Sequence, residues 1–194
     1  MGRLHSEAVP LETACLLAFQ FNSVRNAKRP SLRVAFRWRI SFMNRQFYVF
    51  TDGSSIGNPG PGGWAAVFMS GGRQWDISGA CSWTTISEME LMAAIQALRS
   101  IPAGSKINLY SDSDYLIRGM KYLATRWRNH GWLNRRGLPL QHQELWRELL
   151  QREKVAHIRW TWVRGHGGHR LQDRADELAY AEARHRVLAL RGAA

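Results

Sequence analysis

Residues 50–65 read Phe50-Thr51-Asp52-Gly53-Ser54-Ser55-Ile56-Gly57-Asn58-Pro59-Gly60-Pro61-Gly62-Gly63-Trp64-Ala65. The apolar run 47–50 leads into this stretch, and its aromatic and β-branched residues are typical of a strand buried on both faces. The strand is expected to end at Asp52, before a turn rich in Gly, Pro, Asn and Ser. A carboxylate at the end of a buried strand loses solvation free energy unless something pairs with it. Asp before Gly also begins many ordinary turns, so its role depends on whether other carboxylates reach the same place.

The composition indicates a basic protein of one ordinary domain. The chain has 194 residues, 45% of them hydrophobic, a formal net charge of +12 and a pI of about 10.8. Such a charge favours a polyanionic partner, most simply nucleic acid, and nine Trp residues argue against a ribosome-coating protein. Cys15 and Cys81 lie far apart without metal-ligand spacing, which favours a reducing compartment and a cytoplasmic location. No apolar run is long enough to span a membrane.

The first 42 residues differ from the rest because they carry seven Lys or Arg residues against two Glu and show no clear periodicity. Three interpretations remain open: an upstream extension from a misassigned start, a disordered basic arm, or an organellar targeting peptide. We expect no fixed fold before about residue 44, except a short helix over residues 11–19. The expected organisation is a basic extension over 1–43, a catalytic domain over 44–188 and a tail over 189–194.

Apolar runs and turn signals predict the remaining elements. The expected strands cover residues 46–52, 63–69, 73–82, 106–111 and 157–163, with a hairpin turn at residues 70–72. The expected helices start near Ser87, where Ser87 and Glu90 have capping-box spacing, and then cover 113–128 with a break, 140–152 and 171–186.

The resulting order, βββαβααβα, predicts an α/β fold with a five-stranded mixed sheet. Three antiparallel strands come first, two parallel strands follow, and helices cover both faces. Sites in such sheets form at the carboxyl ends of parallel strands, near a switch in strand order. The first and fourth strands both end on an Asp, Asp52 and Asp112, so these carboxylates are neighbours if the two strands pair.

Two more carboxylates lie on small-residue helix faces that can pack closely on the sheet. Glu90 shares its face with Ala94 and Ala97, and Asp176 is in line with Ala179 and Ala183. Each has an ordinary alternative role, since Glu90 fits a capping box and a helical Asp is usually solvated.

Asp112 also has an ordinary alternative, because it could cap the helix that follows it. Taken together, however, four carboxylates brought close in a core repel one another unless cations neutralise them. Carboxylate-only ligand sets suit Mg²⁺ or Mn²⁺. Two such ions are the usual apparatus for phosphodiester cleavage, so a basic protein with this site is a nuclease candidate.

His166 lies in a glycine-rich loop between the last strand and the last helix. A lone surface His usually has no role. A His that enters a carboxylate site suits proton transfer, because its ordinary pKa is near neutrality. His169, three residues later, is expected to be a solvated loop residue.

The segment from Tyr115 to Gln143 contains no acidic residue. Such a segment could be a solvated basic face with two half-buried Trp residues, or a surface for phosphates and sugars of one nucleic-acid strand. Its basic and aromatic members are Arg118, Lys121, Arg126, Trp127, Arg128, Trp132, Arg135 and Arg136.

Six collinear motifs resemble those of the type 1 ribonuclease H family, over about residues 45–186. They are Phe50-Thr51-Asp52-Gly53-Ser54, Gly57-Asn58-Pro59-Gly60, Met89-Glu90-Leu91-Met92-Ala93-Ala94, Ser111-Asp112-Ser113, Trp162-Val163-Arg164-Gly165-His166 and Asp173-Arg174-Ala175-Asp176-Glu177-Leu178-Ala179. The resemblance implies the βββαβααβα fold, hydrolysis of RNA in RNA–DNA hybrids with 3′-hydroxyl and 5′-phosphate products, and two Mg²⁺ ions, for which Mn²⁺ could substitute.

The resemblance also implies site residues. The catalytic, metal-binding carboxylates are Asp52, Glu90, Asp112 and Asp176, and His166 is the mobile catalytic histidine. Expected contacts to RNA 2′-hydroxyl groups are Gly53, Ser54, Ser55 and Asn58, and Thr85 matches a contact to a DNA phosphate. The basic protrusion that grips the DNA strand would present Arg126, Trp127, Arg128, Trp132, Arg135 and Arg136. Ile86 and Ser87 replace a pair of Asn found in many members, and Gln172 replaces a common Asn.

Two alternatives to a free-standing nuclease remain. A nuclease domain that works with a polymerase would need a separate partner, because the chain is too short to contain one. A module that binds hybrids without chemistry would have no need for four carboxylates and His166. We expect a monomer with no obligate protein partner.

Overall fold

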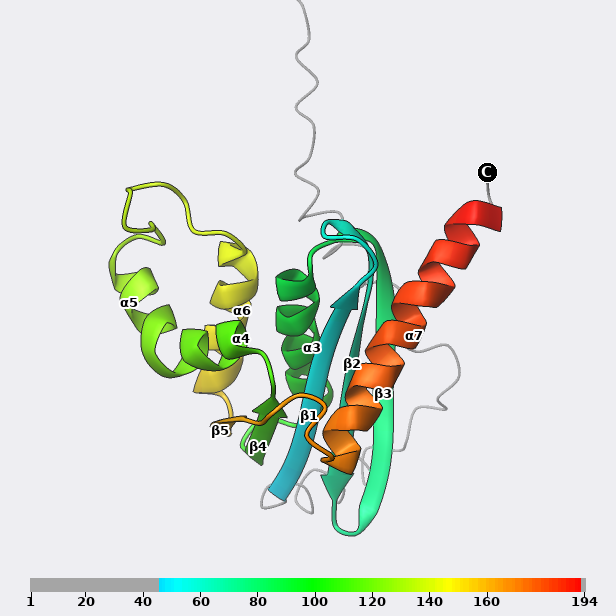
Figure 1. The fold of residues 1–194 in the computed structure, drawn as a ribbon. Coiled ribbons are helices and arrows are strands. Elements are labelled where there is room, and N and C mark those ends of the chain that lie inside the picture. Colours follow the sequence, from blue (N-terminus) through cyan, green and yellow to red (C-terminus); the bar gives the residue numbers. More distant parts are fainter. Residues whose placement is uncertain (1–45, 193–194) are drawn as a thin grey trace, which may run out of the picture.

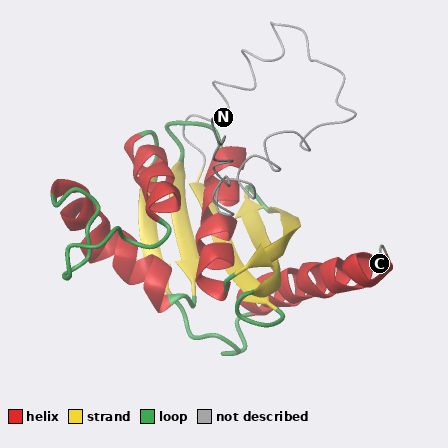
Figure 2. Ribbon diagram, turned by 90° about the horizontal axis from the view of Figure 1, so that it is seen from above, coloured by secondary structure: helices red, strands yellow, loops and turns green. Residues whose placement is uncertain are grey.

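The structure, a computed structural model, describes residues 46–192 and consists of one mixed sheet between helices (Figures 1 and 2). The strand order is β3-β2-β1-β4-β5. The strands are β1 (Gln46–Ser55), β2 (Gly60–Ser70), β3 (Arg73–Thr84), β4 (Lys106–Ser111) and β5 (His157–Trp162). β2 is antiparallel to β1 and β3, whereas β4 is parallel to β1 and β5. The predicted sheet and the pairing of the first and fourth strands are thus confirmed.

The helices lie on both faces of this sheet (Figure 2). They are α3 (Ile86–Ser100), α4 (Asp114–Arg118), η1 (Gly119–Leu123), α5 (Ala124–Asn129), α6 (Gln143–Lys154) and α7 (Arg170–Gly192). The expected break in the helical segment over residues 113–128 is the π-helical turn η1. Its first residue, Gly119, lies directly on the ring of the buried Trp146, where any side chain would overlap that ring. None of the helices in residues 46–192 is long and apolar enough to cross a membrane.

Two boundaries differ from the predicted ones. α7 continues to Gly192, beyond the expected end at residue 186, and takes in most of the expected tail. β1 continues to Ser55 instead of ending at Asp52, because residues 52–55 remain paired with β2 after the pairing with β4 has ended. Asp52 therefore lies inside a strand, opposite Ala65. The predictions for residues 1–43, including the short helix over 11–19, fall outside the described residues.

The start of α3 differs from the predicted capping box. Thr85 is the N-cap, and its hydroxyl accepts a hydrogen bond of 3.2 Å from the Glu88 backbone N–H. The Glu88 carboxylate in turn accepts a bond of 2.7 Å from the Thr84 hydroxyl. Since α3 begins at Ile86, the pairing of Ser87 with Glu90 was wrong. The Glu90 carboxylate is consequently available to point elsewhere.

Glycines allow both large helices to approach the sheet closely. A side chain at Gly53 in β1 would overlap the backbone of α3 at Met89 and Glu90. A side chain at Gly63 in β2 would overlap the backbone of α7 at Ala179. Because successive residues of a strand point to opposite faces, such contacts fix helices on each side of the sheet. They hold the helices that carry Glu90 and Asp176 within reach of β1.

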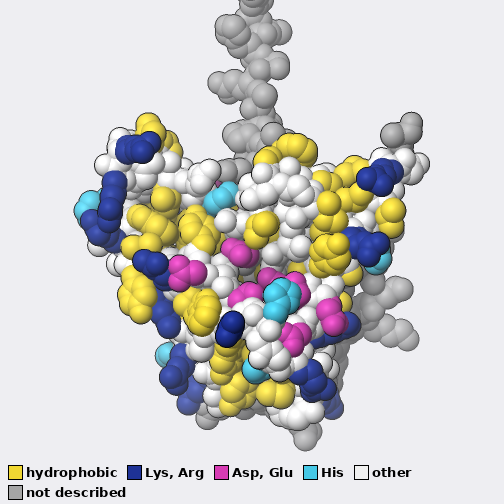
Figure 3. Space-filling model, viewed as in Figure 1, with side chains coloured by type: hydrophobic (Ala, Val, Ile, Leu, Met, Phe, Trp, Pro, Cys, Tyr) yellow, Lys and Arg dark blue, Asp and Glu magenta, His cyan; other side chains and the backbone are white. Residues whose placement is uncertain are grey.

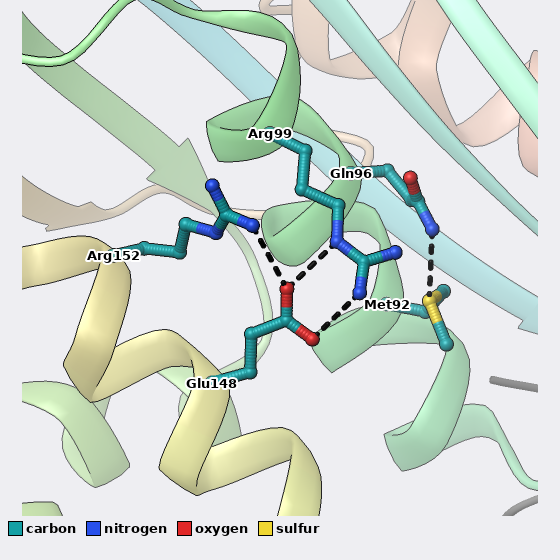
Figure 4. A network of polar contacts seen from close by, with 5 residues as sticks. All are labelled: Met92, Gln96, Arg99, Glu148 and Arg152. Carbon is teal, nitrogen blue, oxygen red and sulfur yellow. Dashed lines mark hydrogen bonds and ion pairs between the residues drawn. The ribbon is translucent and has the colours of Figure 1, made fainter. Parts of the chain in front are cut away.

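The helix α6 is fastened to α3 by a network of charges (Figure 4). Glu148 accepts two hydrogen bonds of 2.7 Å from Arg99, in a bidentate pair, and Arg152 lies 3.4 Å from the same carboxylate. Arg99 and Glu148 are both largely buried, with side chains 24% and 17% exposed. The pair therefore keeps a defined geometry, unlike most surface ion pairs. It anchors the region of α4, α5 and α6 to the core.

We predict that Gly63→Ala destabilises the fold by about 1–3 kcal/mol, because the added methyl group forces α7 away from β2. Gly192→Ala, at the end of α7, is the control, since a methyl group added there meets no other part of the protein within 4 Å. Urea denaturation gives the free energy of unfolding. A Gly63→Ala variant as stable as the control would contradict the close packing described above.

Candidate active site

Four carboxylates from four separate elements meet beside the carboxyl end of β1. Asp52 comes from β1, Glu90 from α3, Asp112 directly follows β4, and Asp176 comes from α7. Figure 3 shows a cluster of acidic side chains near the middle of this face, with a histidine side chain against it. The structure thus brings together all four carboxylates that the sequence singled out.

Asp52 is the most buried member of this cluster. It is 8% exposed, and its carboxylate accepts a hydrogen bond of 2.8 Å from the Gly53 N–H. Burial, followed by the negative charge of Asp112, raises the pKa of Asp52 to about 8 against the effect of that bond. Asp176 adds to the rise and shares a hydrogen bond with Asp52. In the metal-free protein Asp52 therefore keeps its proton at neutral pH.

Glu90 is held by a residue that the sequence analysis gave no role. The Ser113 hydroxyl donates a 2.5 Å hydrogen bond to Glu90 and accepts one of 3.1 Å from Leu116 N–H. Ser113, not Asp112, is therefore the N-cap of α4. Burial raises the pKa of Glu90, the bond from Ser113 lowers it, and the charge of Asp112 raises it further. A Ser directly after an Asp, at the start of a helix, was the signal available in the sequence.

Asp112 is surrounded by groups from β5 and α7. Its carboxylate accepts a hydrogen bond of 3.1 Å from Gln172, and its backbone oxygen accepts one of 3.0 Å from the Trp162 indole. Gly165 lies directly against the carboxylate, where a side chain would overlap it. Burial raises the pKa of Asp112, a backbone hydrogen bond lowers it, Asp176 raises it, and His166 lowers it.

His166 lies at the edge of the cluster. Its side chain is 83% exposed, and its Nδ1 is 3.6 Å from the Asp176 carboxylate. Its backbone is left-handed, with φ of 48°. His169 is exposed, as expected, but it is more than a solvated residue. Its ring stacks on Phe50 at 4.5 Å, and its backbone oxygen accepts bonds from the first turn of α7.

The loop after β1 and the start of α3 lie next to each other. The Asn58 side-chain oxygen accepts a hydrogen bond of 3.3 Å from the Ile86 N–H, and the Ser55 hydroxyl donates one of 3.4 Å to Thr84. Gly53 is buried under α3, whereas Asn58 is exposed. The expected RNA contacts thus share one surface with the expected DNA contact, Thr85, although several of their polar groups already have partners within the chain. Ser54 is half-buried there.

The basic segment forms a separate surface on α4, α5 and the loop after them, where Lys and Arg gather at the left of Figure 3. Arg126, Arg128, Arg135 and Arg136 are exposed. A cavity of about 490 Å³ opens there, and its lining is Leu123, Arg126, Trp127, His130, Leu133, Asn134, Arg135 and Gly137.

The two Trp residues of this segment differ in their positions. Trp127 is half-buried, packs edge-on against Trp146 at 5.2 Å and reaches the cavity wall. Trp132 is only 5% exposed, and the Arg147 guanidinium lies 4.9 Å over its ring. The burial of Trp132 contradicts its predicted substrate contact. The ring is a core residue that supports the loop.

The carboxylate cluster carries negative charge that the described residues leave uncompensated. No Lys or Arg of residues 46–192 forms a salt bridge with Asp52, Glu90, Asp112 or Asp176, and the His166 Nδ1 lies 3.6 Å from the Asp176 carboxylate. Within the same residues, no three acidic, His or Cys side chains are already arranged around a metal position. The carboxylate oxygens and the negative charge of the cluster suit a hard divalent cation.

The fold and the position of the acidic site define a protein of the ribonuclease H-like fold class. The chain belongs to the ribonuclease H family, since the model of the RNase H family matches residues 44–184. It is 44% identical over 133 residues to the ribonuclease H of Geotalea uraniireducens, covering 69% of this chain and 90% of that protein.

Two solved structures share the fold. One is LC9-RNase H1, a type 1 RNase H with the type 2 active-site motif, with a TM-score of 0.66 and 27% identity over 74% of each chain. The other is LC11-RNase H1 in complex with an RNA/DNA hybrid, with a TM-score of 0.58 and 19% identity over 73% of this chain and 99% of that one. The resemblance to type 1 ribonuclease H is thereby confirmed.

We predict that the metal-free protein loses stability as the pH rises. Folded Asp52 keeps its proton up to about pH 8, whereas the unfolded chain loses it near the ordinary value of 3.8. Between these values the unfolded state binds fewer protons, so the free energy of unfolding falls with pH. In chelator at pH 8, Asp52→Asn should be more stable than the wild type by several kcal/mol, since each unit by which the pKa is raised corresponds to about 1.4 kcal/mol.

Asp114→Asn is the matched control, because this Asp is exposed on the surface. At pH 4 the wild type and Asp52→Asn should be nearly equal in stability, since the side chain of residue 52 is then neutral in the folded state of both proteins. Thermal denaturation from pH 4 to pH 9 gives both curves. Parallel curves for the wild type and Asp52→Asn would contradict the raised pKa.

Proposed function

We propose that this protein is an endonuclease that hydrolyses the RNA strand of RNA–DNA hybrids. The observation that carries the proposal is the cluster of four carboxylates, with the buried Asp52 at its centre and three half-buried members around it, on the fold of a ribonuclease H. The hybrid seen with LC11-RNase H1 supports the choice of substrate. The strong positive charge of the chain also favours a nucleic-acid substrate.

We assign Asp52, Glu90, Asp112 and Asp176 as the residues that hold two Mg²⁺ ions, with Mn²⁺ as a substitute. When bound, this pair of cations supplies an activated water for attack on phosphorus and charge stabilisation at the leaving 3′ oxygen, which gives 3′-hydroxyl and 5′-phosphate ends. Asp52 gives up its proton to become a ligand, because a carboxylate binds a cation in its ionised form. Ser113 keeps the Glu90 carboxylate oriented toward the cluster.

His166 is proposed to move protons between the cluster and solvent. Its exposure and its distance of 3.6 Å from Asp176 support this role, since Nδ1 can exchange a proton with water and still reach the site. A basic segment beside the cluster would hold the DNA strand through Arg126, Arg128, Arg135, Arg136 and the edge of Trp127. The surface formed by Ser54, Ser55, Asn58 and Thr85, with the backbone of Gly53, would meet the minor groove of the hybrid.

The first test is cleavage of a labelled RNA–DNA hybrid beside single-stranded RNA, duplex RNA and duplex DNA, with Mg²⁺ or with chelator. We expect cutting of the hybrid alone, only with Mg²⁺, and a fall of at least about a thousandfold for Asp52→Asn, since the variant loses a central ligand. Asp114→Asn, an exposed acid, should keep full activity. Hybrid binding without any cutting would contradict the proposal and favour a catalytically inactive hybrid-binding module.

The basic surface generates a separate prediction. Replacing Arg126 and Arg128 together by Gln should weaken hybrid binding and reduce the slope of log K against log salt by about two, since each phosphate contact contributes about 0.9. Fluorescence anisotropy at several salt concentrations, in chelator, measures the slope. Arg73→Gln is the control, because Arg73 is exposed in the β2–β3 hairpin, outside the basic segment. An unchanged slope in the double variant would contradict a phosphate-binding role.

A further inference from the structure

The spacing between Asp52 and Asp112 is not set by the sheet itself. The pairing of β1 with β4 ends at Phe50 and Tyr110. Asp52 and Asp112 each lie two residues beyond that last pair, where the two strands are no longer paired. A site that holds two cations nevertheless needs a defined distance between its carboxylates. The Thr51 hydroxyl still donates a long hydrogen bond of 3.5 Å to the Tyr110 backbone oxygen, so a contact that reaches the Asp112 carboxylate must come from another group.

Gln172 of α7 spans this gap. Its side-chain nitrogen lies 3.3 Å from the Thr51 backbone oxygen, on β1, and 3.1 Å from the Asp112 carboxylate. A primary amide has two N–H groups, so each acceptor can receive its own hydrogen. The residue is 1% exposed, and packing therefore restricts its side chain. The amide thus links β1 to the segment after β4 at a position where the two have no backbone hydrogen bond.

The side-chain oxygen of Gln172 helps to explain why this position is a Gln. Its side-chain oxygen is buried and has no hydrogen-bond partner. Exchanging the oxygen and the nitrogen would place the oxygen against two acceptors, so the orientation is fixed by its surroundings. A buried oxygen without a partner destabilises a fold. The amide is thus better explained by what its nitrogen holds than by a contribution to stability.

We propose that Gln172 is a positioning residue that fixes the Asp112 carboxylate relative to β1, and with it the separation of the two cations. This inference rests on the proposed function of the cluster. A neutral amide suits the task, because Lys or Arg would compete with a cation for Asp112 and a fifth carboxylate would add to the repulsion. Gln172 itself lies beneath the carboxylates and does not contact the substrate.

The test uses the full chain with Gln172→Leu, which keeps the volume but removes both donors. Groups behind metal ligands are typically worth about 10–100-fold in affinity or activity. We expect kcat to fall by about tenfold or more and the half-saturating Mn²⁺ concentration, measured by electron paramagnetic resonance without substrate, to rise about tenfold. KM for the hybrid should stay within about twofold, and Tm in chelator should stay equal or rise.

Two further variants make the result specific. Gln172→Asn keeps the amide on a shorter stem, so intermediate values of kcat and Mn²⁺ affinity are expected. Gln96→Leu is the matched control, because Gln96 on α3 donates only to the Met92 sulfur, at 3.4 Å, away from the cluster (Figure 4). It should bind Mn²⁺ and cleave the hybrid as the wild type does.

Three results would overturn the inference. Unchanged Mn²⁺ affinity and kcat in Gln172→Leu would show that the amide positions nothing. A rise in KM alone would make Gln172 a substrate contact. A fall in Tm that accounts for the lost activity would make it a structural residue. Failure of the wild type to cleave would instead contradict the proposed function, and the Mn²⁺ measurement would still decide the role of Gln172.

Discussion

The structure depends on one electrostatic constraint, which is the crowding of like charges around the buried Asp52 of β1. Asp52, Asp112 and Asp176 influence one another directly, and Glu90 joins them through Asp112. In the metal-free protein, a proton on Asp52 relieves part of this repulsion. A divalent cation would relieve more of it, and the free energy released would favour binding. The same arrangement therefore lowers stability without metal and favours function with it.

The remainder of the fold keeps this cluster together. Gly53 and Gly63 let α3 and α7 approach the sheet from opposite faces, and Thr85 and Ser113 begin helices so that Glu90 is oriented toward the site. The basic segment packs on α6 through Trp127 and Trp146, and the ion pair of Glu148 with Arg99 joins α6 to α3. Charge of opposite sign is thus presented on two neighbouring surfaces, as gripping a nucleic acid beside an acidic site requires.

Much of this could be predicted from the sequence, since apolar runs, glycine turns and Ala-rich helix faces indicate a mixed sheet with an Asp in or just after each of two neighbouring strands. The four carboxylates follow because each has its own local signal, such as Asp52 before Gly53. The roles of Ser113 and Gln172 could not be predicted, because they depend on contacts between elements far apart in the chain. Trp132 shows that burial can also be missed. A Trp in a basic loop is expected to be exposed, and only the tertiary structure reveals the packing of Arg147 over its ring. The start of α3 differed because Thr85 and Ser87 both have capping chemistry, and only tertiary packing selects between them.

The most direct test is a count of the protons released when Mg²⁺ binds, obtained by calorimetry at pH 7 in two buffers with different ionisation enthalpies. The account predicts release of about one proton per protein, because Asp52 is largely protonated before binding and ionised afterwards. At pH 9 the release should vanish while binding persists. Binding at pH 7 without proton release, or no binding at all, would contradict the claim that a cation takes the place of the proton in this cluster.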